Sequence, residues 1–229
     1  MTFRDLASVT DGLTEAFGRA LPLTDLPLGE RASMRYPALL PLMRFTARQY
    51  ACPGFGNVFA MHTRAMGLMQ LSTLVLTPNC GRDVPLLLID VMRFGKKNAA
   101  FVEYYDCTAP GVTAPALSAV AEKYAALPDY AEKPAWYVGE RAPYSLIKGG
   151  EDEAALLSML SDSIEAYAAS IREQTWERPE NRAGLSAFID RMLREGNPSS
   201  STMERVLGKR GAAEFFLAAI MPKQYRDAK

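Results

Sequence analysis

The chain has 229 residues, of which 48% are hydrophobic and 23% are charged, a composition ordinary for a globular protein. Its 26 basic and 26 acidic residues balance, so the overall charge predicts no nucleic acid and no membrane surface as a partner. No apolar run approaches the roughly 20 residues that cross a bilayer, and the first residues lack the basic head and apolar block of a signal peptide. We therefore expect a cytoplasmic protein.

The chain opens with a helical pattern and then changes to strands. Apolar residues recur at helical spacing over residues 3–20, and a connector rich in Pro and Gly follows. Five strands bounded by Pro, Gly or Asn are expected next, at 43–51, 57–64, 69–77, 84–94 and 98–107. Their links are too short to hold crossover helices, which predicts antiparallel neighbours.

The second half of the chain is mainly helical in pattern. Helices are expected at 114–127, 152–174, 183–195 and 202–221, with a segment rich in Pro and aromatic residues between the first two. The strand that includes 86–94 carries apolar side chains on both of its faces, which indicates that helices cover both faces of the sheet. The sequence thus predicts an α+β fold, a three-layer α/β/α sandwich with a central, mainly antiparallel sheet, as one domain over 1–229.

Several chemistries lack the residues they need. The three cysteines, Cys52, Cys80 and Cys107, are far apart and form no CxxC pair, so no zinc or iron–sulfur ligand set is expected. His62 is the only histidine, and no GxSxG turn places a catalytic serine. No nucleotide-binding glycine motif is present. A redox enzyme with this sequence would take its electrons from another protein.

Two acidic residues stand in strands that otherwise read as buried. Strand alternation puts Glu103 on one face with Tyr105, and Asp90 on one face with Leu86 and Leu88. Burying a carboxylate without a partner costs several kcal/mol or keeps the group protonated, and a carboxylic acid in an apolar pocket can donate a proton near neutral pH. The alternative is a structural role, in which an arginine pairs with each acid; the candidates are Arg44, Arg64 and Arg93.

Four stretches together resemble the ferredoxin-dependent bilin reductases and the related red chlorophyll catabolite reductases. They are "YACPGFGNVFAMH", "LSTLVLTPNCGRDVPLLLIDV", "NAAFVEYYD" and "STMERVLGKRGAAEFFLAAIMP", the last being the most specific. The second stretch is similar to a family strand that ends in Pro and continues to "LPxFGxD", with Asp90 as its acid. The resemblance extends over about 44–221 and implies the same α/β/α sandwich.

The resemblance also implies roles for individual residues. Glu103 falls on the strand that carries the family's catalytic aspartate and would be the proton donor, with Asp90 as a secondary or structural carboxylate. A family histidine falls on Thr73, and a family glutamate falls on Met61, one residue before His62. Because one step along a strand reverses the face, His62 could replace that glutamate only if the register shifts.

Other expected substrate contacts lie later in the chain. A polar residue just before the family's last helix falls on Ser200, with Asn197 nearby, and a family arginine that meets a propionate corresponds to Lys148. Arg205 is a second candidate for a propionate. Lys148 would offer only a point charge where an arginine offers a fork of donors.

The resemblance implies a linear tetrapyrrole as substrate and no bound metal or flavin. Reduced ferredoxin would supply single electrons, and acidic side chains would supply protons. Lys96 and Lys97 could help to dock an acidic ferredoxin, although a solvated hairpin tip also explains them. Two other functions remain open: a non-catalytic carrier for a bilin, haem or another flat apolar ligand, and an interaction protein whose two acids are only structural.

Overall fold

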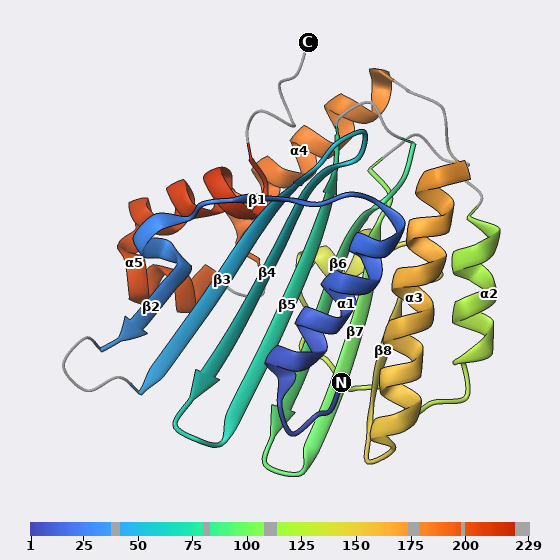
Figure 1. The fold of residues 1–229 in the computed structure, drawn as a ribbon, viewed down its shortest axis with the longest axis horizontal. Coiled ribbons are helices and arrows are strands. Elements are labelled where there is room, and N and C mark those ends of the chain that lie inside the picture. Colours follow the sequence, from blue (N-terminus) through green and yellow to red (C-terminus); the bar gives the residue numbers. More distant parts are fainter. Residues whose placement is uncertain (38–41, 80–82, 108–113, 174–178, 198–199, 223–229) are drawn as a thin grey trace.

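A large antiparallel sheet between two layers of helices forms the fold in the computed structural model of the chain (Figure 1), which describes residues 1–37, 42–79, 83–107, 114–173, 179–197 and 200–222. The sheet has eight strands in the order β1-β3-β4-β5-β6-β7-β8, and β2 pairs with β3 as well. The strands are β1 (Thr24–Leu26), β2 (Ser33–Tyr36), β3 (Met43–Cys52), β4 (Gly56–Ala65), β5 (Met69–Pro78), β6 (Leu86–Phe94), β7 (Lys97–Tyr105) and β8 (Leu146–Gly150).

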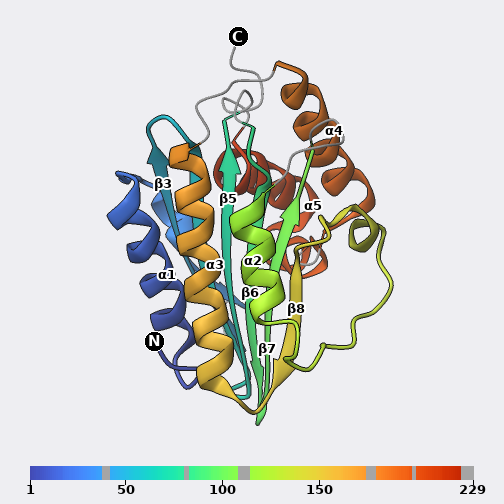
Figure 2. The same cartoon turned by 90° about the vertical axis from the view of Figure 1, so that its right-hand side faces the viewer.

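The helices divide between the two faces of the sheet, as Figure 2 shows. One face is covered by α1 (Leu6–Ala20), α2 (Pro115–Lys123) and α3 (Glu153–Glu173). The other face is covered by α4 (Pro179–Glu195), α5 (Ser200–Phe215) and the π-helical turn η3 (Phe216–Ile220). Two short 3₁₀ turns, η1 (Gly29–Ala32) and η2 (Trp136–Glu140), complete the elements. The predicted α/β/α sandwich is confirmed.

Each face of the sheet carries its own hydrophobic core. Val58, Leu74, Ile89 and Val102 point toward α1 and α3, and we call this the α3 face. Phe59, Val75, Leu88 and Tyr105 point toward α4 and α5, and we call this the α5 face. Strand β4 is buried at nearly every position, as expected for a strand covered on both sides.

The structure contains three strands that the sequence pattern does not predict. β1 and β2 are short edge strands that both pair with β3, at its two ends. β8 extends the opposite edge by pairing with β7. The last predicted helix is also interrupted, because Gly208 has φ 71° and ψ 163°, outside the helical region. No helix in the described ranges combines the length and apolar character needed to cross a membrane.

Candidate functional site

The register of the central strands brings three positions of interest into one row on the α5 face. Met61 on β4 lies opposite Thr73 on β5, and Thr73 lies opposite Asp90 on β6. Residues directly opposite each other on one face of an antiparallel sheet have Cβ atoms roughly 5 Å apart. The resemblance places a family glutamate at Met61 and a family histidine at Thr73. Asp90 is therefore the one acidic side chain among these three positions.

Asp90 is held by its neighbour on β5. The Thr73 hydroxyl donates a hydrogen bond of 2.5 Å to Asp90 Oδ1. Burial raises the pKa of Asp90 from 3.8 to about 6, and the hydrogen bond from Thr73 limits that rise because it favours the charged form. Asp90 thus has the properties of a group that keeps a proton in weakly acidic solution and can release it near neutral pH.

A small cavity of about 30 Å³ lies above this row. Asp90 and Thr73 form its polar part together with Asn197, which follows α4. The remaining lining is apolar and comes from the sheet, α4 and the C-terminal segment: Phe59, Met61, Val75, Leu88, Met192, Phe216, Ile220 and Met221. A second cavity of about 70 Å³ shares Asn197, Phe216 and Ile220 with the first, and Ser200 lines it as well.

Glu103 lies on the same face but has a different environment. It is diagonal to Asp90, because its direct partner on β6 is Leu88. Its carboxylate forms an ion pair with Arg141, and the Tyr105 hydroxyl donates a hydrogen bond of 3.2 Å to Oε1. Burial raises the pKa of Glu103 to about 7, and the charge of Arg141 opposes that rise. Glu103 is absent from the lining of the cavity above Asp90.

Arg141 connects this acid to a second one. Its guanidinium binds both carboxylate oxygens of Glu132, at 2.5 and 2.8 Å, in addition to Glu103. The Arg141 and Glu103 side chains are only 8% and 3% exposed. If the two acids had only a structural role, each was expected to pair with Arg44, Arg64 or Arg93. Glu103 does pair with an arginine, but that arginine is Arg141. Arg64 pairs with Asp5, and Arg93 pairs with Glu153.

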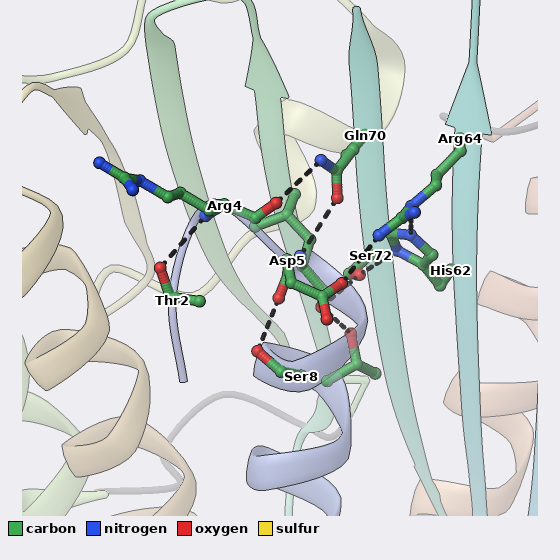
Figure 3. A network of polar contacts seen from close by, with 10 residues as sticks. Thr2, Arg4, Asp5, Ser8, His62, Arg64, Gln70 and Ser72 are labelled. Atoms are coloured by element: carbon green, nitrogen blue, oxygen red, sulfur yellow. Dashed lines mark hydrogen bonds and ion pairs between the residues drawn. The ribbon is translucent and has the colours of Figure 1, made fainter. Parts of the chain in front are cut away.

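Two expected substrate-binding residues lie on the opposite face of the sheet, which corrects that expectation. His62 points toward α1 on the α3 face (Figure 3), where Nδ1 meets the Ser72 hydroxyl at 2.9 Å and Nε2 accepts a hydrogen bond of 3.2 Å from Arg64 Nε. Since Ser72 donates its own proton to the Leu6 carbonyl, at 2.8 Å, His62 Nδ1 carries the hydrogen. The register does not shift, so His62 does not take the place of Met61.

Lys148 is the second of these residues. It pairs with Ala100, whose side chain belongs to the core on the α3 face. Its ammonium group donates to the carbonyls of Ala125 and Leu127, both at 3.0 Å, and pairs with Asp129 at 2.6 Å. Lys148 therefore stabilises the chain that follows α2 and does not reach the cavity. Arg205 is exposed on α5.

An amide clamp attaches the C-terminal wall of the cavity to the sheet. Asn57 on β4 donates two hydrogen bonds of 3.0 Å, to the carbonyls of Ala219 and Ile220. Gln49 on β3 donates to Asn57 at 2.8 Å and to the Ala218 carbonyl at 3.2 Å, and Thr77 donates to Ile220 at 3.3 Å. These bonds fix η3, from which Phe216 and Ile220 reach the cavity. Sequence reasoning missed the clamp and Arg141, because each contacts residues distant along the chain.

Comparison with known proteins supports the fold. No protein-family model and no curated protein sequence matches the chain. Among solved structures, the chain is similar to phytochromobilin synthase from tomato, crystallised in complex with biliverdin, with a TM-score of 0.77. The alignment covers 97% of this chain and 83% of the tomato chain at 11% identity. At that identity the likeness establishes the architecture alone, and the chain has the same α/β/α sandwich fold as the tomato protein.

Proposed function

We propose that the chain binds a linear tetrapyrrole between the sheet and the α4–α5 layer and reduces it with electrons from an external one-electron carrier such as reduced ferredoxin. The observation that supports this best is a buried carboxyl of raised pKa, Asp90, facing an apolar cavity in a fold similar to that of a biliverdin-binding enzyme. Reduction of one double bond consumes two electrons and two protons. Two successive one-electron transfers from the carrier supply the electrons. Solvent is the source of both protons, one of which passes through Asp90, and the Asp90 carboxylate is then reprotonated from solvent.

This proposal exchanges the roles expected for the two acids. Asp90 shares a cavity with Thr73 and Asn197, whereas Glu103 forms an ion pair with Arg141 and accepts a hydrogen bond from the Tyr105 hydroxyl. The pKa of Glu103 is also raised, to about 7, but its carboxyl is occupied by these partners and does not line the cavity in which we place the substrate. In our proposal Asp90 is the catalytic acid, and Glu103 with Arg141 shapes the adjoining surface.

Binding requires the cavity to enlarge. Pockets for ligands of this size occupy roughly 300–1,000 Å³, and the cavity above Asp90 measures about 30 Å³. We infer that α4 and the first half of α5 move away from the sheet. Gly208 supports this, because its non-helical backbone divides α5 into two parts. The amide clamp holds η3, so the movement would have its fixed point on the C-terminal side of Gly208.

The test is a titration of the purified chain with biliverdin, followed by anaerobic addition of reduced ferredoxin. We expect a red-shifted visible band on binding and a time-dependent change of that band on reduction. Asp90→Asn should bind the pigment and lose turnover by about a hundredfold or more, as removal of a general acid typically does. Glu103→Gln should retain most turnover. The reverse ranking would return the donor role to Glu103, and an unchanged pigment spectrum would reject both binding and chemistry.

A non-catalytic carrier is the second candidate. One observation favours it. In the row formed by Met61, Thr73 and Asp90, only Asp90 is titratable, so this row offers a single group for proton transfer. A carrier would give the red-shifted band and then no further change with reduced ferredoxin.

A further inference from the structure

The large hydrophobic side chains exposed in the described part of the chain are Met1, Leu42, Met66, Leu68 and Phe94. Met1 lies against Gly12 of α1, and the others gather at one end of the sheet. Four of them are neighbours through the backbone: the Met66 amide donates to the Leu42 carbonyl at 2.8 Å, and the Gly95 amide, next to Phe94, donates to the Leu68 carbonyl at 3.2 Å. They lie at the β4–β5 and β6–β7 turns and at the start of β3, toward the bottom of Figure 1. We call these four residues the tip surface.

Met66 is unusual for its position in two respects. It has φ 47° and is the only non-glycine residue with positive φ in the described ranges, and Gly67 follows it with φ 68°. These two residues are the central ones of the β-turn that the Leu68 amide closes on the Ala65 carbonyl at 3.2 Å. A turn with both central φ values positive prefers Asn or Asp before Gly, because their short polar side chains tolerate that backbone. Met66 is nonetheless 69% exposed. An apolar side chain at this tip goes against both the turn preference and solvation, which indicates a surface contact.

A row of arginines crosses the sheet just above the tip surface. Arg35 on β2 lies opposite Arg44 on β3, and Arg44 lies opposite Arg64 on β4. Like charges placed directly opposite each other destabilise a sheet, so the row favours an anion. All three side chains are exposed. Asp5 pairs with Arg64 at 3.0 Å (Figure 3), and within the described residues no carboxylate lies within ion-pair distance of Arg35 or Arg44.

The spacing between tip and arginine row suits a bilayer surface. Arg64 precedes Met66 by two residues, and a strand rises about 3.4 Å per residue, so the row lies roughly 7 Å from the tip. Apolar groups of interfacial proteins are buried about 5–10 Å into the boundary between headgroups and acyl chains. With the tip surface inserted to that depth, the arginines reach the level of the phosphates. Lys96 and Lys97 border the same surface from the second hairpin.

We propose that this end of the molecule docks on a bilayer that contains anionic phospholipids, with the tip surface inserted and Arg35, Arg44 and Arg64 at the phosphates. The tip side chains project from separate turns and line none of the cavities described above, which suits a fluid surface better than a shaped protein partner. Of the acids nearby, Asp5 and Glu153 are each paired with an arginine. Glu151 and Asp152 are exposed, but they follow β8 at the other edge of the sheet, away from the arginine row on β2, β3 and β4. The balanced overall charge of the chain gives no sign of this surface, because it counts these five basic residues together with the charges of the rest of the molecule.

The test is co-sedimentation of the whole chain with vesicles of phosphatidylcholine alone and of phosphatidylcholine with phosphatidylserine. We expect binding to the anionic vesicles, little binding to the neutral ones, and weakening at high salt. Binding to neither kind of vesicle overturns the proposal. So does capture of an acidic protein such as ferredoxin by this surface while the vesicles stay unbound. Neither result depends on a bilin, so this test and that of the proposed function fail separately.

Two variants and one control identify the surface. Met66→Asn removes the most exposed of the four tip side chains and supplies a residue that suits the turn, so folding is preserved, and vesicle binding should fall about tenfold. Arg44→Gln should reduce binding about fivefold and weaken its salt dependence. Arg210→Gln, whose side chain is 94% exposed on α5 on the opposite face, should bind like the unaltered chain. Equal losses in all three variants, or no loss in Met66→Asn, would contradict the assignment.

Discussion

The Thr73 hydroxyl donates a 2.5 Å hydrogen bond to the Asp90 carboxylate across β5 and β6, and both side chains border the same cavity. This contact explains how a sheet core accommodates an acid without a cation. One strong donor partly offsets the cost of burial, so the group stays titratable in the range where many enzymes work. Glu103, a diagonal neighbour, is stabilised instead by a full ion pair with Arg141. The two acids therefore respond differently to mutation and to pH.

Asp90→Asn should make the stability of the chain less dependent on pH. The native pKa of Asp90 is about 6 and its ordinary value is 3.8, so the native state keeps a proton that the unfolded chain releases as the pH rises. The contribution of Asp90 to stability is complete below about pH 4 and is lost as the pH rises through about 6. The variant should thus match the unaltered chain at pH 4 and exceed it by up to about 3 kcal/mol at pH 8.

Urea denaturation of both proteins at several pH values from 4 to 8 measures this difference. Asn retains an oxygen that accepts from Thr73, so the hydrogen bond is preserved and only the charge is removed. Asp25→Asn, at an exposed position on β1, provides the control. A difference between Asp90→Asn and the unaltered chain that stays constant across this range would mean that Asp90 is not buried in the way described.

Arg141→Met should destabilise the protein by about 3 kcal/mol at pH 8, because it leaves the buried carboxylate of Glu103 without its counter-charge. Without Arg141 the pKa of Glu103 rises further, since the charge that opposed the rise is gone. The carboxyl then protonates more readily as the pH falls, and the penalty should shrink at pH 5. Thermal or urea unfolding at the two pH values tests this.

Arg194→Met is the matched control for that substitution, because its side chain is 69% exposed on α4. Exposed substitutions of this kind usually change stability by less than about 0.5 kcal/mol. Equal losses for Arg141→Met at pH 5 and pH 8 would argue against the ion pair as the cause.

Gly208→Ala should destabilise the folded chain by about 1–3 kcal/mol. With φ 71° and ψ 163°, Gly208 occupies a region of backbone space that is almost exclusive to glycine. A Cβ at this position would meet no heavy atom within 4 Å, so the expected cost comes from the backbone alone. Gly139→Ala, also in open space but without a positive φ, should be nearly neutral. If Gly208→Ala proved as stable as Gly139→Ala, α5 could adopt a continuous helix at little cost.

The sequence predicted the central strands because several physical signals agreed there. In β3 to β7 the turn residues and the β-branched content marked the ends to within a few residues, and the period of two assigned Asp90 and Glu103 to the faces on which the structure has them. β1 and β2 were not predicted, because a strand of three or four residues is too short to show a clear alternation of apolar and polar residues. β8 ends in two glycines and contains a buried lysine, so it resembled a loop.

The site was less predictable, since it depends on contacts between distant segments. Alternation places a side chain on a face but does not name its partner. Arg141 reaches Glu103 from a loop without regular structure, and no spacing in the sequence links the two residues. The lone histidine shows the strength of the alternation rule. Its offset of one residue from Met61 put it on the opposite face, and no shift in register compensated.

The amide clamp has a consequence for how the protein is made. Asn57 and the carbonyl that it binds at Ala219 are separated by 162 positions. At a translation rate of about 5–20 residues per second, the ribosome needs on the order of ten to thirty seconds to deliver the second partner after the first. During that interval the apolar side of the nascent sheet that later meets α4 and α5 lacks its cover. A chaperone that binds uncovered strands would therefore bind the α5 face of the sheet, because the helices that cover this face are synthesised last.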